Sequence, residues 1–361
     1  VNITVYRMEA SPRRGFEGVR DYLLLSLITL LEAVTHFGNL YNDSHFYIKF
    51  THYFQTGQGF DEAALYIRPL IPWLTAHLEP LLGVRNAYGF LNTILWLLST
   101  LLLYQLALKI LGDRGQALLA GLLFTTSRPI LLFGASVLTD MSGYFFIIAT
   151  IYLLYTRGDR WDGVVLASLT LAIGSLAREM VLVCILYAFL LLVASKKMKL
   201  SMFAVFLLIS LSFIIAWTSY VGSLLNYASW YREALGVGVE RGVLGPVALV
   251  RSFIGAFTLS LLYSFIGFLG EERADALKTI YLIFIPFFIF LLLIPSDIRF
   301  TFLLYPALMP LAGRGIEDLA EALNQKPILK ILDKRYWVAI LLLIYIISNH
   351  YIAREAFTLP I

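Results

Sequence analysis

Residues 200–221 read LSMFAVFLLISLSFIIAWTSYV and contain no charged side chain. As a helix, this run is long enough to cross the hydrocarbon core of a bilayer, which needs about 20 residues. Apolar runs recur along the chain: hydrophobic types make up 59% of the 361 residues and charged types only 14%. Soluble domains carry about 25% charged residues, and the mean hydropathy here is +0.78. The sequence therefore predicts an all-α polytopic membrane protein.

Eleven segments have the length and apolar character of membrane spans. The single cysteine, Cys184, lies inside one of them, which excludes a disulfide framework and zinc-finger spacing. Basic residues are scattered or stand in short clusters, so a nucleic-acid partner is not expected. The predicted spans are 22–38, 86–111, 115–134, 136–156, 162–177, 179–195, 200–221, 247–269, 279–295, 300–313 and 336–352.

Lysine and arginine placement sets the orientation, because cytoplasmic loops of membrane proteins are enriched in these residues. With a cytoplasmic N-terminus, the cytoplasmic segments hold 18 of the 28 basic residues, although the outer segments are longer. We therefore predict a cytoplasmic N-terminus. No cleavable signal peptide is evident, since the first apolar run starts late.

Residues 1–361 read as a single integral-membrane domain, in which 39–85 form an outer loop between span 22–38 and the spans of 86–352. The stretch 44–54 places four aromatic side chains on one helical face, which favours a helix lying in the membrane interface. The stretch 65–82 holds three prolines and three polar or ionisable groups, so we expect a second interfacial or re-entrant element.

With this topology, costly ionisable groups from distant parts of the chain collect at the outer ends of the spans. A functional role is favoured for Asp43, and the other groups each have a simpler interpretation. Asp140 is also explained as a helix cap, the two arginines as side chains that reach lipid headgroups, and Asp297 as a partner of Arg299. Glu179 is expected to pair with the adjacent arginine. The collected residues are Asp43, Asp140, Arg178, Glu179, Asp297 and Arg299.

Standard motifs of soluble enzymes are missing, including the phosphate loop, the nucleophile elbow and the dinucleotide fingerprint. Chemistry would have to come from the outer acids and arginines, and a divalent metal is a candidate cofactor. The residues considered for it are Asp43, His45 and Asp140. Glu32 and His36 lie one turn apart in the first span, and helix packing is the favoured interpretation for them.

Four stretches resemble the GT-C superfamily of integral-membrane glycosyltransferases, which includes protein O-mannosyltransferases and aminoarabinose transferases. In that superfamily an acid follows the first span, and Asn42 here replaces the first of the two adjacent acids of the O-mannosyltransferases, which puts an acidic-pair metal site in doubt. The stretches are Tyr41-Asn-Asp-Ser-His-Phe-Tyr47, Phe124-Thr-Thr-Ser-Arg-Pro with Ser136-Val-Leu-Thr-Asp-Met-Ser-Gly-Tyr-Phe-Phe146, Leu171-Ala-Ile-Gly-Ser-Leu-Ala-Arg-Glu-Met180, and Asp297-Ile-Arg-Phe-Thr-Phe-Leu-Leu-Tyr-Pro306.

The resemblance implies a transferase that moves a sugar from a polyprenyl-phosphate or dolichyl-phosphate donor to a hydroxyl of a glycan, lipid or protein acceptor. Asp43 is expected to act as the base and Asp140 as a second catalytic residue, with inversion at the anomeric carbon. Arg299, Arg178, Asp297 and Arg68 are expected to bind the donor.

The expected location is the plasma membrane of a prokaryote, among its lipids, with the active site on the outer face. The competing function class is a multi-pass transporter or lipid flippase. Transporters place ionisable groups near the bilayer midplane and within internal repeats, whereas here the charges collect at one face and no repeat is visible.

Overall fold

Backbone amides cannot remain unpaired in lipid, and helices pair them within one segment. A computed structural model describes residues 12–58, 67–221, 246–294, 297–326, 329 and 332–358, and these residues form helices and no strand. Some residues used in the predictions lie outside the described parts: Arg7 and Lys330 among the basic residues of the cytoplasmic segments, Leu65 at the start of the stretch 65–82, and Pro295 at the end of the predicted span 279–295. The all-α prediction is confirmed.

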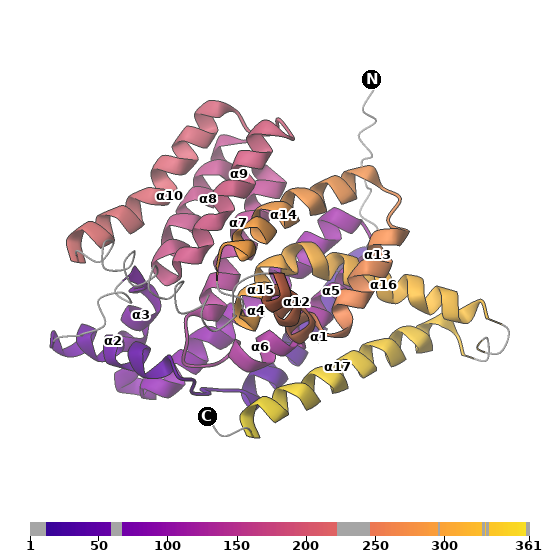
Figure 1. Cartoon of the computed structure of the whole chain (residues 1–361), viewed down its shortest axis with the longest axis horizontal. Helices are drawn as coiled ribbons and strands as arrows, with labels where there is room; N and C mark the ends of the chain where they lie inside the picture. Colours follow the sequence, from indigo (N-terminus) through magenta and orange to yellow (C-terminus); the bar gives the residue numbers. More distant parts are fainter. Residues whose placement is uncertain are drawn as a thin grey trace.

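In the first half of the chain, two short helices from the predicted outer loop 39–85 lie between the long helices α1 and α4 (Figure 1). The expected element 44–54 lies within helix α2, and the part of 65–82 from Leu70 onward forms helix α3. The helices of this half are α1 (Pro12–Thr35), α2 (Ser44–Thr56), α3 (Leu70–Leu82), α4 (Val84–Leu111), α5 (Arg114–Thr125), α6 (Arg128–Phe133), α7 (Asp140–Arg157), α8 (Trp161–Ala177), η2 (Glu179–Val183), α9 (Cys184–Val193) and α10 (Leu200–Val221).

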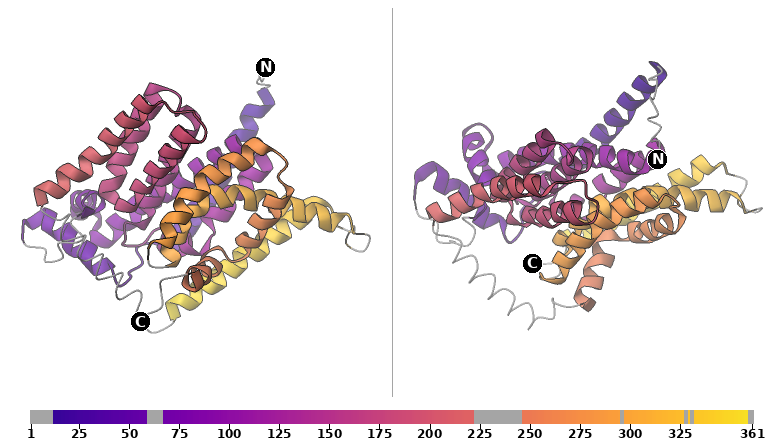
Figure 2. Two further views of the ribbon diagram at one scale, coloured as in Figure 1. Left: turned by 45° about the horizontal axis from the view of Figure 1, so that its top comes forward. Right: turned by 90° about the horizontal axis from the view of Figure 1, so that it is seen from above.

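The second half forms its own packed group. Helices α7 to α10 lie together on one side of the molecule, the later helices lie on the other, and α10 and α17 form opposite edges (Figures 1 and 2). Helices α4 and α5 join the two groups, since α4 packs on α7 and α5 packs on α16. The later helices are α12 (Pro246–Phe257), α13 (Leu259–Gly270), α14 (Ala274–Leu292), α15 (Ile298–Thr301), η3 (Phe302–Leu304), α16 (Tyr305–Asn324) and α17 (Lys334–Thr358).

Four helices among the described residues are long and apolar enough to cross a membrane by themselves, and a fifth span results if α12 and α13 count as one. They are α4, α10, α14 and the Lys334–Arg354 part of α17. Two shorter apolar helices, Trp161–Ala177 and Glu179–Val193, match the predicted spans 162–177 and 179–195 closely. The chain is an integral membrane protein, while the count of eleven spans stays a prediction.

The predicted span 115–134 is wrong as a single helix, because α5 ends at Thr125 and α6 begins at Arg128. Pro129 lies in the first turn of α6. A proline in the interior of a continuing helix would lack its amide donor and would clash with the carbonyl four residues earlier, here that of Thr125.

The predicted span 247–269 is also wrong as a straight helix. Its two halves, α12 and α13, are bent by 94° at Thr258. Thr258 has φ 49° and ψ −127°, a conformation that is rare for a β-branched residue. Its hydroxyl lies 2.8 Å from the Asn349 side-chain oxygen, which ties the bend to α17.

The predicted span 300–313 has the wrong bounds. The chain first makes α15 and the short helix η3, and α16 then continues to Asn324. Helix α16 packs closely against α13: a Cβ on Gly315 would lie 1.8 Å from the Tyr263 carbonyl oxygen, and one on Gly267 would lie 2.0 Å from the Leu311 oxygen. Small residues allow helix backbones to approach in this way inside membranes.

We expect Gly315→Ala to destabilise the protein by at least the 1–3 kcal/mol typical of overpacking, because the clash is with backbone. The thermal midpoint in detergent micelles measures the change. Gly18→Ala on α1 is the matched control, since no atom lies within 4 Å of a Cβ there. Equal midpoints for the two variants would contradict the close contact of α13 with α16.

Candidate active site

Asp43, Asp297 and Arg299 form one ionic cluster at the predicted outer side. Arg299 Nη1 donates to Asp43 Oδ2 at 2.6 Å, and Arg299 Nε donates to Asp297 Oδ2 at 3.1 Å. The Asp297 side chain also accepts from the Arg299 amide and so caps α15. Asp297 lies two residues before Arg299, whereas Asp43 lies 256 residues before it, so folding of the chain brings Asp43 to the other two. The predicted partnership of Asp297 and Arg299 is observed.

Asp43 occupies the N-cap position of α2 but makes no side-chain cap hydrogen bond. Its side chain is 42% exposed, so water or a substrate reaches the carboxylate. Burial alone would raise the pKa of Asp43, but the guanidinium groups of Arg299, Arg178 and Arg68 outweigh burial and hold that pKa below its ordinary value. Asp43 is thus ionised at neutral pH.

Arg299 is stabilised as a cation by the same cluster. Burial would lower the pKa of Arg299, but three acids, Asp140, Asp297 and Asp43, raise it. The Tyr144 hydroxyl donates to the Arg299 carbonyl oxygen at 2.9 Å and helps to fix the backbone there. A permanent positive charge therefore lies beside an ionised carboxylate.

A cavity of about 400 Å³ opens beside this cluster. Arg128, the first residue of α6, supplies a second guanidinium to its wall, and the Arg128 Nη1 donates to the Gly255 carbonyl oxygen at 2.9 Å. Helices α6, α12 and α15 meet at this place (Figure 1). The cavity is lined by Leu40, Tyr41, Asn42, Asp43, Arg128, Leu132, Phe133, Asp297, Ile298 and Arg299.

Asp140 lies behind the cavity wall. It is 1% exposed, it is not among the cavity residues, and its Oδ2 lies 3.1 Å from Arg178 Nη1. Neither carboxylate oxygen accepts a hydrogen bond, so the alternative that Asp140 caps its helix is wrong. Asp140 instead balances the charge of the buried Arg178, which is 3% exposed.

Glu179 does not pair with its neighbour Arg178, contrary to expectation. Its two carboxylate oxygens accept from Arg68 Nε at 2.6 Å and from Arg68 Nη2 at 2.5 Å. Arg178 has an extended backbone, with φ −160° and ψ 120°. Successive side chains of extended backbone point in opposite directions, so Arg178 turns to Asp140 and Glu179 turns to the first loop.

Tyr47 and Thr139 connect the two buried ion pairs, and no sequence pattern marks either residue as part of a site. The Tyr47 hydroxyl accepts from Arg68 Nη1 at 2.8 Å and lies 3.2 Å from the Thr139 hydroxyl, which is 3.3 Å from Arg178 Nη1. Arg128 was also missed, although it lies in the stretch before Pro129 that carries part of the resemblance. Arg128 directly follows the break between α5 and α6, and the proline after it is the sequence feature that points to this position.

The three candidate metal ligands Asp43, His45 and Asp140 are not brought together. His45 is exposed, and its Nδ1 contacts the Asn42 carbonyl oxygen, while Asp140 is buried against Arg178. Within the part of the chain that the structure describes, the one group of three potential ligands is Glu32, His36 and His350.

Known proteins share this sequence and architecture in part. A family model described as dolichyl-phosphate-mannose-protein mannosyltransferase matches residues 67–220, which include Asp140, Arg178 and Glu179. No curated protein matches the sequence.

Solved structures match nearly the whole chain. An archaeal oligosaccharyltransferase from Archaeoglobus fulgidus, in complex with an inhibitory peptide and a dolichol-phosphate, has a TM-score of 0.61 at 11% identity, over 96% of this chain and 56% of its own. The apo oligosaccharyltransferase from the same organism has a TM-score of 0.60 at 13% identity, and the match covers 94% of this chain and 55% of that one. ArnT from Cupriavidus metallidurans, bound to undecaprenyl phosphate, has a TM-score of 0.61 at 14% identity, and the match covers 93% of this chain and 72% of that one.

The three solved structures show that the chain shares their fold, and the family model matches less than half of the chain. The chain spans just over half the length of the two oligosaccharyltransferases. The transporter or flippase alternative is not favoured by any of them.

Proposed function

We propose that the chain is a glycosyltransferase that moves a sugar from a polyprenyl-phosphate donor to an acceptor hydroxyl on the non-cytoplasmic face of a prokaryotic plasma membrane. The observation that carries the proposal is the 2.6 Å pair of Asp43 and Arg299 on the wall of an open cavity. Two structures of similar fold contain a dolichol-phosphate and an undecaprenyl phosphate, which supports a lipid-phosphate donor here.

The cationic wall suits the phosphate of such a donor. Arg299 and Arg128 line the cavity, and guanidinium groups bind phosphate oxygens through paired hydrogen bonds. The phosphate gains charge as its bond to the sugar breaks, so these contacts strengthen in the transition state. Arg178 and Arg68 lie behind them in buried ion pairs and add positive potential at Asp43.

Asp43 is the proposed base. The acceptor oxygen attacks the anomeric carbon, its proton passes to an Asp43 carboxylate oxygen, and the bond from that carbon to the phosphate oxygen breaks, releasing the polyprenyl phosphate. A single displacement with no enzyme nucleophile inverts the anomeric carbon. In this scheme Asp140 is a positioning residue for Arg178, and Asp297 positions Arg299.

Donor binding also prepares the base. Arg299 Nη1 holds Asp43 before the donor arrives, and a phosphate competes with the carboxylate for that guanidinium. Transfer of Arg299 to the phosphate frees Asp43 and removes the strongest cause that lowers its pKa. Asp43 therefore becomes a better proton acceptor when the donor is in place.

The direct test uses the purified protein in lipid nanodiscs with radiolabelled polyprenyl-phosphate mannose or glucose. We expect sugar release to water, or transfer to an added acceptor, with polyprenyl phosphate as the second product. Movement of the intact donor across proteoliposome membranes, with no cleavage of the sugar–phosphate bond, would contradict a transferase.

The pH dependence of kcat/KM tests the Asp43–Arg299 pair. Because Arg299 holds the pKa of Asp43 below the ordinary aspartate value of ~3.9, wild-type activity should stay level as pH falls towards that value. Arg299→Gln leaves Asp43 buried and removes the main group that lowers its pKa. The fall of kcat/KM at acid pH should therefore occur at a higher pH in this variant. An acid limb at the same pH in both proteins would contradict the pairing.

A further inference from the structure

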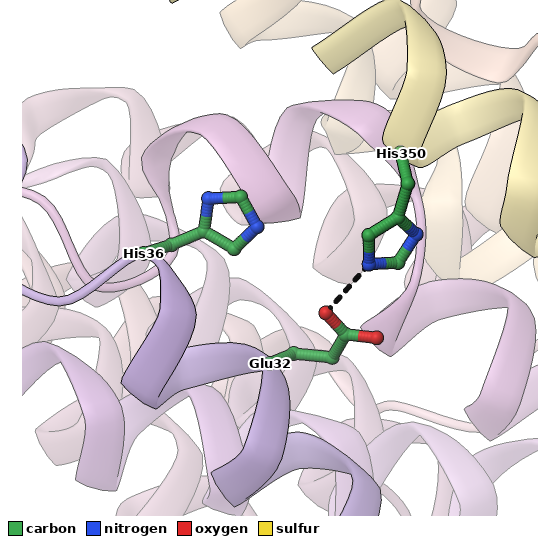
Figure 3. A group of neighbouring side chains, drawn as sticks. All are labelled: Glu32, His36 and His350. Atoms are coloured by element: carbon green, nitrogen blue, oxygen red, sulfur yellow. Dashed lines mark hydrogen bonds and ion pairs between the residues drawn. The ribbon is translucent and has the colours of Figure 1, made fainter. Parts of the chain in front are cut away.

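A second cluster of potential ligands joins the first and last described helices. Glu32 lies in the last turn of α1, His36 follows that helix directly, and His350 lies on α17. One ligand atom from each residue lies within 4.8 Å of the others. Figure 3 shows the two imidazole rings on either side of the Glu32 carboxylate. Segments more than 300 residues apart thus supply two nitrogens and one oxygen to one point.

The hydrogen bonds of His350 show that a positive species belongs between its ring and Glu32. His350 Nδ1 lies 2.9 Å from the Ile346 carbonyl oxygen. A carbonyl only accepts, so Nδ1 carries a proton, and in the neutral ring Nε2 then carries a lone pair. That Nε2 lies 2.8 Å from Glu32 Oε2, which also presents a lone pair. Two acceptors in contact need a proton or a metal cation between them.

The same arrangement is the one that metal-binding histidines use. The second ring nitrogen usually donates to a carbonyl or carboxylate, which fixes the tautomer and aims the free nitrogen at the metal. Two imidazoles and one carboxylate are a ligand set of zinc sites that keep a fourth position for water. The same donors also suit Co²⁺ and Ni²⁺.

Metal ions have a route to this point. The Glu32 side chain is 14% exposed and that of His350 is 39% exposed. A cavity of about 420 Å³ adjoins the cluster and is lined by Glu32, Ile346, Ile347, His350, Tyr351 and Arg354. This cavity shares no residue with the one beside Asp43 and Arg299.

We propose that Glu32, His36 and His350 bind one zinc-class divalent cation, which ties the end of α1 to α17. Helices α1 and α17 both pack on α5 and already meet through the contact of Glu32 with His350, and the ion would strengthen this link and add His36 to it. The link fixes the chain at His36, which lies seven residues before Asp43. The site is separate from the proposed transfer chemistry and does not depend on it.

The test is zinc binding by the full chain, purified without a polyhistidine tag, treated with a chelator and desalted. After addition of ZnCl₂ and a second desalting, elemental analysis should give about one zinc per wild-type protein. Glu32→Gln, which keeps the size of the side chain, and His350→Ala should each weaken zinc binding by at least the 10–100-fold seen when outer-shell partners are lost. Co²⁺ should give the visible spectrum of a four-coordinate site in wild type only.

His77→Ala is the matched control. His77 Nδ1 contacts the Trp73 carbonyl oxygen four residues earlier, as in His350, but His77 lies on α3 outside the cluster. We expect this variant to bind zinc as wild type does. Equal zinc affinity in wild type and Glu32→Gln would overturn the proposal, and so would an equal loss in His77→Ala. Because glutamine has nearly the same size as glutamate, the zinc affinity of Glu32→Gln still tests the proposal if His350→Ala fails to fold.

Discussion

Asp43→Asn should lower sugar transfer by about 10²–10⁴-fold, the usual contribution of a positioned general base. The amide keeps the shape of the side chain but cannot accept the acceptor's proton. Asp43 makes no cap hydrogen bond and is 42% exposed, so the thermal midpoint should change little. The loss should fall on kcat, measured with saturating polyprenyl-phosphate sugar, rather than on donor binding.

Two further variants make this result specific. Asp162→Asn changes an exposed acid in the first turn of α8, whose contacts are with Arg157 and Arg160, and should leave transfer unchanged. Asp297→Asn should cause a smaller loss than Asp43→Asn, because Arg299 keeps its bond to Asp43. If Asp43→Asn retains wild-type kcat while Asp297→Asn does not, the base has been assigned to the wrong acid.

Arg178→Met should destabilise the protein by about 3–5 kcal/mol, the cost of leaving one member of a buried ion pair without its partner. Asp140 would remain 1% exposed without its ion-pair partner. Loss of the contact from Arg178 to Thr139 would also disturb the connection to Tyr47 and Arg68. Unfolding in denaturant, followed by the intrinsic fluorescence of the detergent-solubilised protein, measures the change.

The double variant Asp140→Leu, Arg178→Met should recover much of that loss, because a buried pair is often replaced by apolar residues at little cost. Arg160→Met is the matched control. It breaks the exposed pair with Asp162, and such pairs contribute only about 0–1 kcal/mol. Simple addition of the two single effects in the double variant would show that Asp140 and Arg178 do not interact in the membrane.

The sequence predicted which charged residues share one side of the protein, since this followed from the placement of spans and basic loops. It could not predict their partners. Adjacent residues suggested a pair of Arg178 with Glu179, but the extended backbone at Arg178 separates the two side chains. Their real partners, Asp140 and Arg68, come from distant segments and depend on how the helices pack.

The helix breaks show the same limit. Pro129 was a visible signal that the predicted span 115–134 is interrupted. Thr258 offered none, because threonine rarely adopts positive φ and only tertiary contacts, such as the one with Asn349, hold it there. His350 was likewise missed as a partner of Glu32, since α17 and α1 meet only in the folded protein.

A structure of the protein with bound polyprenyl phosphate tests the central claim most directly. We predict the phosphate in the cavity of α6 and α15, with its oxygens within hydrogen-bond distance of the Arg299 guanidinium and with Asp43 released from Arg299. A lipid phosphate bound outside this cavity, with the 2.6 Å contact between Asp43 and Arg299 unchanged, would contradict it.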